Sequence, residues 1–172
     1  MQGILLIGMP GVGKSAIGKK VAEMLGFSFY DGDAEIEKKH SDRQDFLDRK
    51  GDEAYVEMEC SIIAGLPRED SVLSPGGSII YSKECMKSLG CCFKVFLDAS
   101  LDTVRKRLIN VDSRGIVFLR KLGMEALHRQ RRVLCLKYAD IIIDTESRTE
   151  EELAKEIVAA YSVRQLSGKN PP

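Results

Sequence analysis

The stretch Gly8–Ser15, which reads GMPGVGKS, constrains the fold of this chain more than any other feature. It follows a short apolar run (residues 3–7) and precedes an amphipathic segment that ends near Leu25. A buried strand, a glycine-rich turn and a helix start, in this order, are the context that a phosphate-binding loop requires. The sequence therefore predicts a P-loop that binds a nucleoside triphosphate. The alternative is a glycine-rich turn that matches by chance.

The residue types of this loop each have a chemical reason. Glycines allow close approaches that a Cβ would forbid, so the loop N–H groups can converge on phosphate oxygens at a helix N-terminus. Lys14 can reach the β- and γ-phosphates, and the Ser15 hydroxyl can coordinate Mg²⁺. The residues expected to bind the nucleotide are Gly8, Gly11, Val12, Gly13, Lys14, Ser15 and Ala16.

The composition is that of an ordinary globular chain. Its 172 residues fit one domain, and 26 Lys and Arg balance 26 Asp and Glu. This balance predicts no basic field for nucleic acid, and no apolar stretch approaches the length of a membrane span. The five cysteines lack paired zinc spacing, and the first strand begins almost at once. We therefore expect a cytoplasmic protein without a signal peptide.

Short apolar runs alternate with helix-forming segments along the whole chain. This alternation predicts an α/β fold with a parallel sheet and with helices on both of its faces. We expect one domain over residues 1–163 and a flexible C-terminal tail over residues 164–172. The strands are expected at residues 3–7, 27–30, 71–74, 92–97 and 140–144.

Acidic residues follow two of the expected strands. Asp31 and Asp33 come after the second strand, and residues two apart in a strand face the same side. Both can therefore point at a site beyond its carboxyl end, where the P-loop also lies. A turn and helix cap is the alternative for this pair. Asp98 ends the fourth strand, where it can bind Mg²⁺, or where it or Ser100 can cap the next helix. We favour the cap.

A basic segment, residues 105–118, mixes Gly, Asn, Asp and Ser with cationic side chains between two expected helices. It can form a lid that closes on phosphates and excludes water. A solvated connector is the alternative.

These features, in this order, resemble those of the shikimate kinase family over about residues 3–161. The resemblance implies a P-loop NTPase fold, a three-layer α/β/α sandwich. Its five-stranded parallel sheet would have the order 2-3-1-4-5, with a mobile lid over about residues 108–119. The matching segments are Gly8–Ser15, Asp31-x-Asp33, Gly51–Glu53 with Glu59, Gly76–Gly77, Arg107–Arg114, Arg131, Ala139-Asp140 and Asp144-Thr145.

The resemblance also implies an activity. ATP and Mg²⁺ would be the cofactors, and the γ-phosphate would pass to a hydroxyl of a small, carboxylate-bearing ring. Asp33 would hold the acceptor hydroxyls and help to deprotonate one, while Asp31 would help to hold the magnesium shell beside Ser15. Catalysis would also use Lys14 and the lid arginine Arg114. The remaining contacts would be those of Arg107 with adenine, and those of Gly76, Gly77 and Arg131 with the acceptor, Arg131 binding its carboxylate.

The chain departs from the family pattern at the acceptor site. Tyr55-Val56 stands where the family has Phe-Arg, so an arginine that would bind the acceptor carboxylate is missing. Ser78 replaces the third glycine of the turn. A bidentate arginine–carboxylate contact is strong and selective. Shikimate is the best single acceptor, and a hydroxyl compound with fewer or no carboxylates is an alternative. A nucleoside or nucleotide kinase and a non-catalytic nucleotide-binding module are further alternatives. We expect a monomer.

Overall fold

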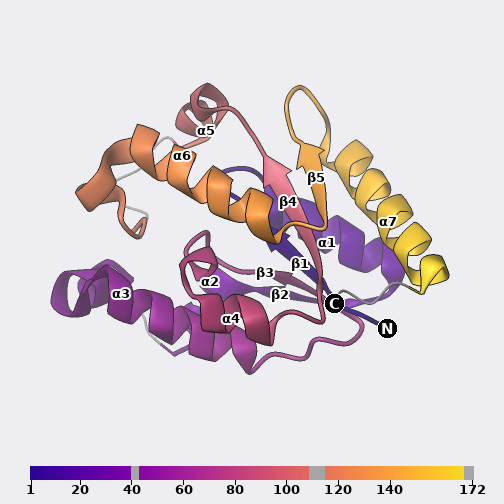
Figure 1. Cartoon of the computed structure of the whole chain (residues 1–172), viewed down its shortest axis with the longest axis horizontal. Coiled ribbons are helices and arrows are strands. Elements are labelled where there is room, and N and C mark those ends of the chain that lie inside the picture. Colours follow the sequence, from indigo (N-terminus) through magenta and orange to yellow (C-terminus); the bar gives the residue numbers. More distant parts are fainter. Residues whose placement is uncertain (40–42, 109–114, 169–172) are drawn as a thin grey trace.

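The computed structural model describes residues 1–39, 43–108 and 115–168, and within them five strands form one parallel sheet (Figure 1). The strands are β1 (Ile4–Ile7), β2 (Ser28–Asp31), β3 (Ser71–Ser74), β4 (Phe93–Asp98) and β5 (Ile141–Asp144). Their order is β2-β3-β1-β4-β5, and every neighbouring pair is parallel. The predicted fold class and strand order are therefore confirmed.

Helices cover both faces of this sheet. They are α1 (Lys14–Leu25), α2 (Gly32–Glu37), α3 (Arg43–Ala64), the 3₁₀ turn η1 (Ile79–Tyr81), α4 (Lys83–Ser88), α5 (Leu101–Arg107), α6 (Leu119–Tyr138) and α7 (Glu150–Ser167). α1 and α7 pack side by side on one face, while α3, α4 and the C-terminal part of α6 lie on the other (Figure 1). This arrangement is the predicted three-layer sandwich.

The central strand β1 is buried on both faces, which explains its unbroken apolar sequence. Ile4 and Leu6 belong to the core that α1 and α7 share, and Leu5 and Ile7 belong to the core under α3 and α4. A parallel strand covered by helices on both faces needs an apolar side chain at every position. The carboxyl end of β1 then delivers the chain directly into the P-loop.

Two helices break at a glycine. α3 changes direction at Gly51 (φ 83°) and α6 at Gly123 (φ 73°). Both helices contribute side chains to the same cavity, which is described below.

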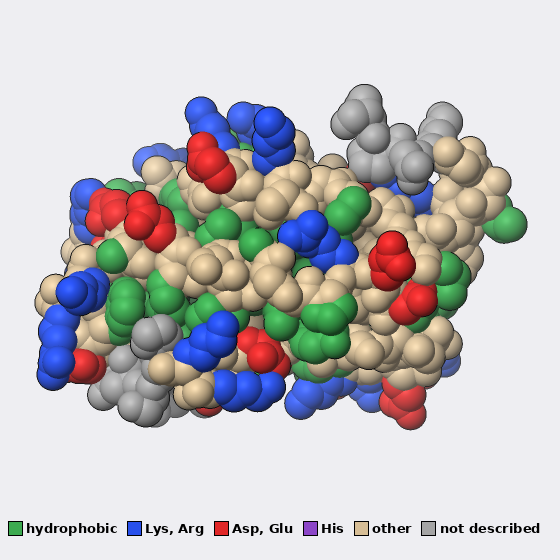
Figure 2. Space-filling view, turned by 90° about the horizontal axis from the view of Figure 1, so that it is seen from below, with side chains coloured by type: hydrophobic (Ala, Val, Ile, Leu, Met, Phe, Trp, Pro, Cys, Tyr) green, Lys and Arg blue, Asp and Glu red, His purple; other side chains and the backbone are tan. Residues whose placement is uncertain are grey.

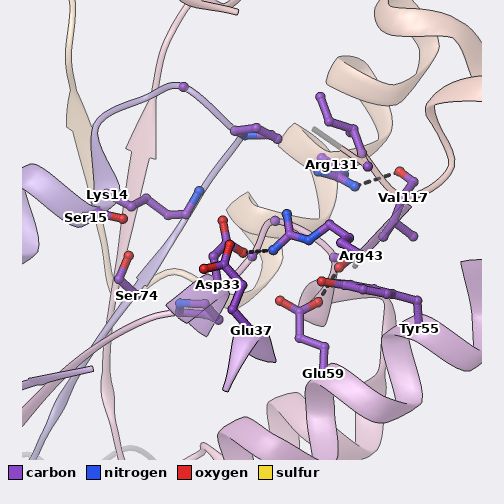
Figure 3. Close-up of a pocket in the computed structure, with 18 of the residues that line it drawn as sticks. Lys14, Ser15, Asp33, Glu37, Arg43, Tyr55, Glu59, Ser74, Val117 and Arg131 are labelled. Atoms are coloured by element: carbon purple, nitrogen blue, oxygen red, sulfur yellow. Dashed lines mark hydrogen bonds and ion pairs between the residues drawn. The ribbon is translucent and has the colours of Figure 1, made fainter. Parts of the chain in front are cut away.

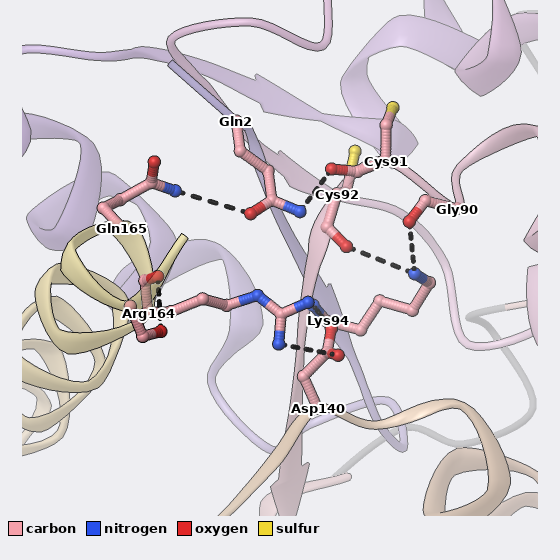
Figure 4. A network of polar contacts seen from close by, with 9 residues as sticks. Gln2, Gly90, Cys91, Cys92, Lys94, Asp140, Arg164 and Gln165 are labelled. Carbon is pink, nitrogen blue, oxygen red and sulfur yellow. Dashed lines mark hydrogen bonds and ion pairs between the residues drawn. The ribbon is translucent and has the colours of Figure 1, made fainter. Parts of the chain in front are cut away.

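The last helix, α7, continues through Ser167, so the predicted tail begins too early. Arg164 Nη1 lies 3.2 Å from Asp140 Oδ1, and the other oxygen of Asp140 accepts a 2.7 Å hydrogen bond from the backbone N–H of Lys94 (Figure 4). The segment is poor in apolar residues, but the contact with Asp140, directly before β5, holds its final turns. Residues 169–172 lie outside the described residues.

Removing this contact has a measurable cost. Arg164→Gln is expected to lower the free energy of unfolding by about 1.5–3 kcal/mol, because the mostly buried carboxylate of Asp140 loses the cation with which it pairs. Urea denaturation measures the change. Arg105→Gln is the matched control, since it removes an exposed pair with Glu125 and should cost less than about 1 kcal/mol. Equal effects of the two substitutions would show that the Arg164–Asp140 contact contributes no more to the free energy of unfolding than an exposed ion pair does.

The surface carries charges of both signs. On the face that Figure 2 shows, Lys and Arg side chains are interspersed with Asp and Glu. No helix within the described ranges has the length and apolar character that crossing a membrane requires.

Candidate active site

The predicted P-loop joins β1 to α1 along a backbone path that requires glycine. Gly8, Gly11 and Gly13 have φ angles of 147°, 80° and 95°, a region where residues with a side chain are strained. A Cβ at Gly8 would also lie 2.5 Å from the carbonyl oxygen of Leu97 in β4. α1 starts after Gly13 without a side-chain cap, so its first N–H groups are available to an anion.

Lys14 is held deep in this loop. Its side chain is largely buried, and its Nζ donates hydrogen bonds to the carbonyl oxygens of Gly8 (3.1 Å) and Met9 (3.0 Å). Burial lowers the pKa of the ammonium group, and the negative charge of Asp33 partly offsets that effect. The loop thus carries a preplaced cation at the point where phosphates would bind.

A cavity of about 700 Å³ lies beside the P-loop (Figure 3). Its walls come from the start of α1, the start of α2, α3, the turn after β3, residues 115–117 and α6. The structure therefore brings together segments that are more than a hundred residues apart in the sequence. The predicted site residues that line it are Gly11, Gly13, Lys14, Ser15, Ala16, Asp33, Gly76, Gly77 and Arg131.

The two aspartates after β2 do different things. Asp31 is the N-cap of α2, where its Oδ1 accepts hydrogen bonds from the backbone N–H groups of Asp33 (3.0 Å) and Ala34 (3.3 Å). Asp33 lies in the first turn of α2 and lines the cavity, whereas Asp31 does not. The strand argument that placed both carboxylates together is wrong, because β2 ends at Asp31. For Asp31 the helix-cap alternative is confirmed.

A buried acid lies behind the turn that follows β3. Glu59 of α3 is fully buried, and one of its oxygens accepts a hydrogen bond from the Ser78 hydroxyl. A Cβ on Gly76 would lie 2.4 Å from the other oxygen, so the turn needs glycine there. Burial raises the pKa of Glu59, and the Ser78 hydrogen bond opposes that shift. Ser78, which replaces the third glycine of the family's turn, is thus turned toward Glu59.

Arg131 reaches the cavity from α6. It is almost fully buried, its Nη2 donates to the carbonyl oxygen of Val117 (2.8 Å), and its guanidinium lies 5.7 Å from the ring centroid of Tyr81. A Cβ on Gly77 would lie 2.7 Å from Arg131 Nη1. The second glycine of the turn is therefore what lets this cation come close to the P-loop.

Sequence reasoning missed Arg43, the first residue of α3. Its Nη2 donates to Asp33 Oδ1, and its guanidinium lies 5.5 Å from the ring centroid of Tyr55 (Figure 3). Arg43 belongs to no motif, so its own position gave no signal. The one indication in the sequence was Val56, because a valine at the family's arginine position leaves the acceptor side of the site with one cation fewer.

Other predicted residues lie around the site. Arg107 of α5 is beside the P-loop and donates to the carbonyl oxygen of Thr145 (3.3 Å).

The turn after β4 is capped by Ser100, one of the two residues that the sequence offered as the cap of α5. Asp98, the other one, instead pairs with Arg132 (2.9 Å). Arg114 falls outside the described residues, as do residues 109–113 of the predicted lid. Gly8 and Val12 belong to the loop but do not line the cavity.

Comparisons with known proteins agree on one family. The family model described as shikimate kinase matches residues 10–162. The shikimate kinase of Thermodesulfovibrio yellowstonii is 32% identical over 173 residues, which cover 98% of this chain and 99% of that protein. Shikimate kinase from Acinetobacter baumannii, solved in complex with shikimate, superposes with a TM-score of 0.87 at 25% identity, covering 96% of each chain. That of Aquifex aeolicus gives 0.81 at 27% identity, covering 96% of this chain and 99% of that one. The chain therefore belongs to the shikimate kinase family, and it is a kinase that acts on a hydroxyl group.

Proposed function

We propose that this kinase uses ATP with Mg²⁺ as donor and shikimate as acceptor. The observation that carries the proposal is the single cavity in which the phosphate loop, with Lys14 and Ser15, faces Asp33 and Arg131. A donor site and an acceptor site must share one cavity for direct phosphoryl transfer. The similar structure from Acinetobacter baumannii, which contains shikimate, supports the same acceptor.

The P-loop supplies the donor site. Phosphoryl transfer depends mainly on positioning and on electrostatic stabilisation of the transferred group. The first-turn N–H groups of α1 and the ammonium group of Lys14 would hold the phosphate oxygens. Because Lys14 is already buried and held by two carbonyl oxygens, little of its conformational freedom remains to be lost when phosphate binds.

Ser15 and Ser74 line the same cavity and can take part in a magnesium site. Asp31 and Ser74 are paired in register at the carboxyl ends of β2 and β3, and Ser74 lines the cavity. The Ser74 hydroxyl is buried without a hydrogen-bond partner among the described residues. Ser15 would bind the ion, and Asp31 and Ser74 would hold its water shell. Mg²⁺ would neutralise negative charge on the phosphates. Magnesium in such sites needs few carboxylates, because phosphate oxygens and water complete its shell.

Asp33 is the proposed base. The acceptor oxygen forms a bond to the γ-phosphorus, the bond between that phosphorus and the β–γ bridging oxygen breaks, and ADP leaves. The hydroxyl proton passes to the Asp33 carboxylate, which is half-exposed at the cavity wall. Arg131 supplies a buried cation for an anionic group of the acceptor.

An assay with a panel of acceptors tests this function. ADP release is measured with ATP, Mg²⁺ and, in turn, shikimate, neutral cyclic alcohols, nucleosides and nucleoside monophosphates. We expect the highest kcat/KM with shikimate. A preference for a nucleoside or its monophosphate would support the nucleotide-kinase alternative, and nucleotide binding without turnover of any acceptor would support the non-catalytic one.

The turn after β3 offers a sharper test of the acceptor end. Gly77→Ala is expected to lower kcat/KM for shikimate by about 10- to 100-fold, because the added Cβ meets both Arg131 and the carbonyl oxygen of Gly8 (3.0 Å). Gly65→Ala is the control, since its nearest neighbour would be an ordinary 3.5 Å away. Steady-state kinetics of both variants checks the prediction. Wild-type kinetics in Gly77→Ala would mean that the position of Arg131 does not matter for the reaction.

A further inference from the structure

The acceptor side of the cavity has a cation that the family pattern did not place there. Val56, which stands at the family's arginine position, is buried in a core cluster with Tyr55 and Val117 and has no group that can bind a carboxylate. Arg43 enters the same cavity from the start of α3. Among the described residues, the cavity wall therefore contains two guanidinium groups, those of Arg43 and Arg131, without an arginine at position 56.

Arg43 is placed by groups on three sides. Its guanidinium lies over the ring of Tyr55, donates to Asp33 and experiences the charge of the buried Glu59 (Figure 3). Burial alone would lower the pKa of Arg43, but Asp33, Tyr55 and Glu59 together more than offset this and raise it. The group is therefore a permanent cation inside the cavity, three-quarters buried at its side chain.

The pairing of Arg43 with Asp33 has a consequence for substrate choice. Asp33 Oδ1 is engaged by the guanidinium, so an acceptor hydroxyl that approaches this oxygen must compete with Arg43. A neutral acceptor displaces Arg43 and leaves a partly buried cation with a weaker set of partners, which is unfavourable. An acceptor with a carboxylate gives the guanidinium a new anionic partner, and two parallel N–H···O bonds can form.

We propose that Arg43 is the second carboxylate-binding residue of the acceptor site, and that it exchanges its bond to Asp33 for the acceptor carboxylate. The inference rests on the proposed function, because it concerns the acceptor of that reaction. It makes Arg43 a specificity-determining residue that favours anionic acceptors and leaves Asp33 available to the hydroxyl only when such an acceptor is bound. With Arg43 in this role, the absence of an arginine at position 56 no longer indicates an acceptor without a carboxylate.

A matched pair of acceptors isolates this role. Shikimate and its methyl ester carry the same hydroxyls, but only the first is an anion. Wild-type protein should prefer shikimate. Arg43→Met should lower kcat/KM for shikimate by about 10- to 100-fold, the loss expected for a charged hydrogen-bonded contact. The same substitution should raise kcat/KM for the ester, because Asp33 is no longer engaged by Arg43. Arg43→Lys keeps the charge without the fork and should be intermediate with shikimate.

Control measurements separate this role from a structural one. Arg49→Met makes the same chemical change on the same helix, at an exposed pair with Asp45, and should leave both acceptors unaffected. The KM for ATP should stay constant in all variants. If Arg43→Met is poorly folded by thermal unfolding, the comparison of Arg43→Lys with wild type decides, because only the shikimate reaction should weaken.

The possible results are distinguishable. A parallel loss with both acceptors, or no change with either, would overturn the role of Arg43 while leaving the kinase function intact. So would a wild-type protein that uses the ester as well as the acid. A wild-type protein that phosphorylates neither acceptor would contradict the proposed function itself, and the inference with it.

Discussion

Asp33→Asn is expected to lower kcat for shikimate phosphorylation by about 10²- to 10⁴-fold, the contribution typical of a positioned general base. Asparagine has nearly the same shape, but its amide cannot take the hydroxyl proton. ATP affinity should change little, because the P-loop contacts do not involve this side chain. Single-turnover kinetics with nucleotide-binding titration separates the two quantities.

The same substitution also reports on Arg43. Asparagine cannot form the ion pair, so Arg43 is more available, and KM for shikimate should not rise. Asp45→Asn, an exposed ion-pair position on α3, is the control and should behave like wild type. Near wild-type kcat in Asp33→Asn would remove Asp33 from the role of base, and loss of ATP binding would show that the substitution acts on the fold.

Lys14→Met is the second substitution with a large expected effect. Removing the ammonium group should lower kcat by about 10²- to 10³-fold, as loss of a preorganised charge-stabilising donor does, and should also weaken ATP binding. The melting temperature should not fall, because the lowered pKa of Lys14 shows that burying this cation is unfavourable for the folded state. Titration calorimetry with ATP and differential scanning calorimetry measure the two effects.

Lys19→Met is the matched control for Lys14. Lys19 is an exposed residue of the same helix, and its Nζ lies 6.0 Å from the ring centroid of Phe29. The Lys19→Met variant should retain wild-type kinetics and wild-type affinity for ATP. A Lys14→Met variant that binds and turns over ATP like the control would show that the P-loop does not hold the donor phosphates in this chain.

The fold could be predicted from the sequence because its main signals are local. The apolar run of β1, the glycines of the P-loop and the alternation of strands with helices each depend on neighbouring residues only. The strand order came from the family resemblance, which adds long-range information that periodicity lacks. The prediction failed at residues 164–167, where Arg164 is ordered by Asp140, a contact that no local pattern encodes.

The candidate site was predictable only where a motif defines it. Asp33 and Lys14 lie in motifs, and the structure places both at one cavity. Asp31 was placed beside Asp33 by strand periodicity, but α2 begins between them and turns Asp31 into its cap. Arg43 was missed because its role depends on α3 lying against α2, a tertiary contact between segments without a recognisable pattern.

The acceptor site shows how a lost residue can be misread from sequence. Val56 alone suggested that the acceptor site had lost a cation. In the folded chain Arg43, at the start of α3, supplies a guanidinium to the same cavity. The number of cations in a cavity is a property of the three-dimensional arrangement, so a position-by-position comparison does not determine it.

The most direct measurement of the central claim is identification of the products. Wild-type protein is incubated with shikimate, ATP and Mg²⁺, and the mixture is followed by ³¹P NMR and mass spectrometry. We predict that shikimate gains a single phosphate in equal amount to the ADP formed, since donor and acceptor meet in one cavity. Formation of ADP and inorganic phosphate with shikimate unchanged, or no reaction of ATP, would contradict it.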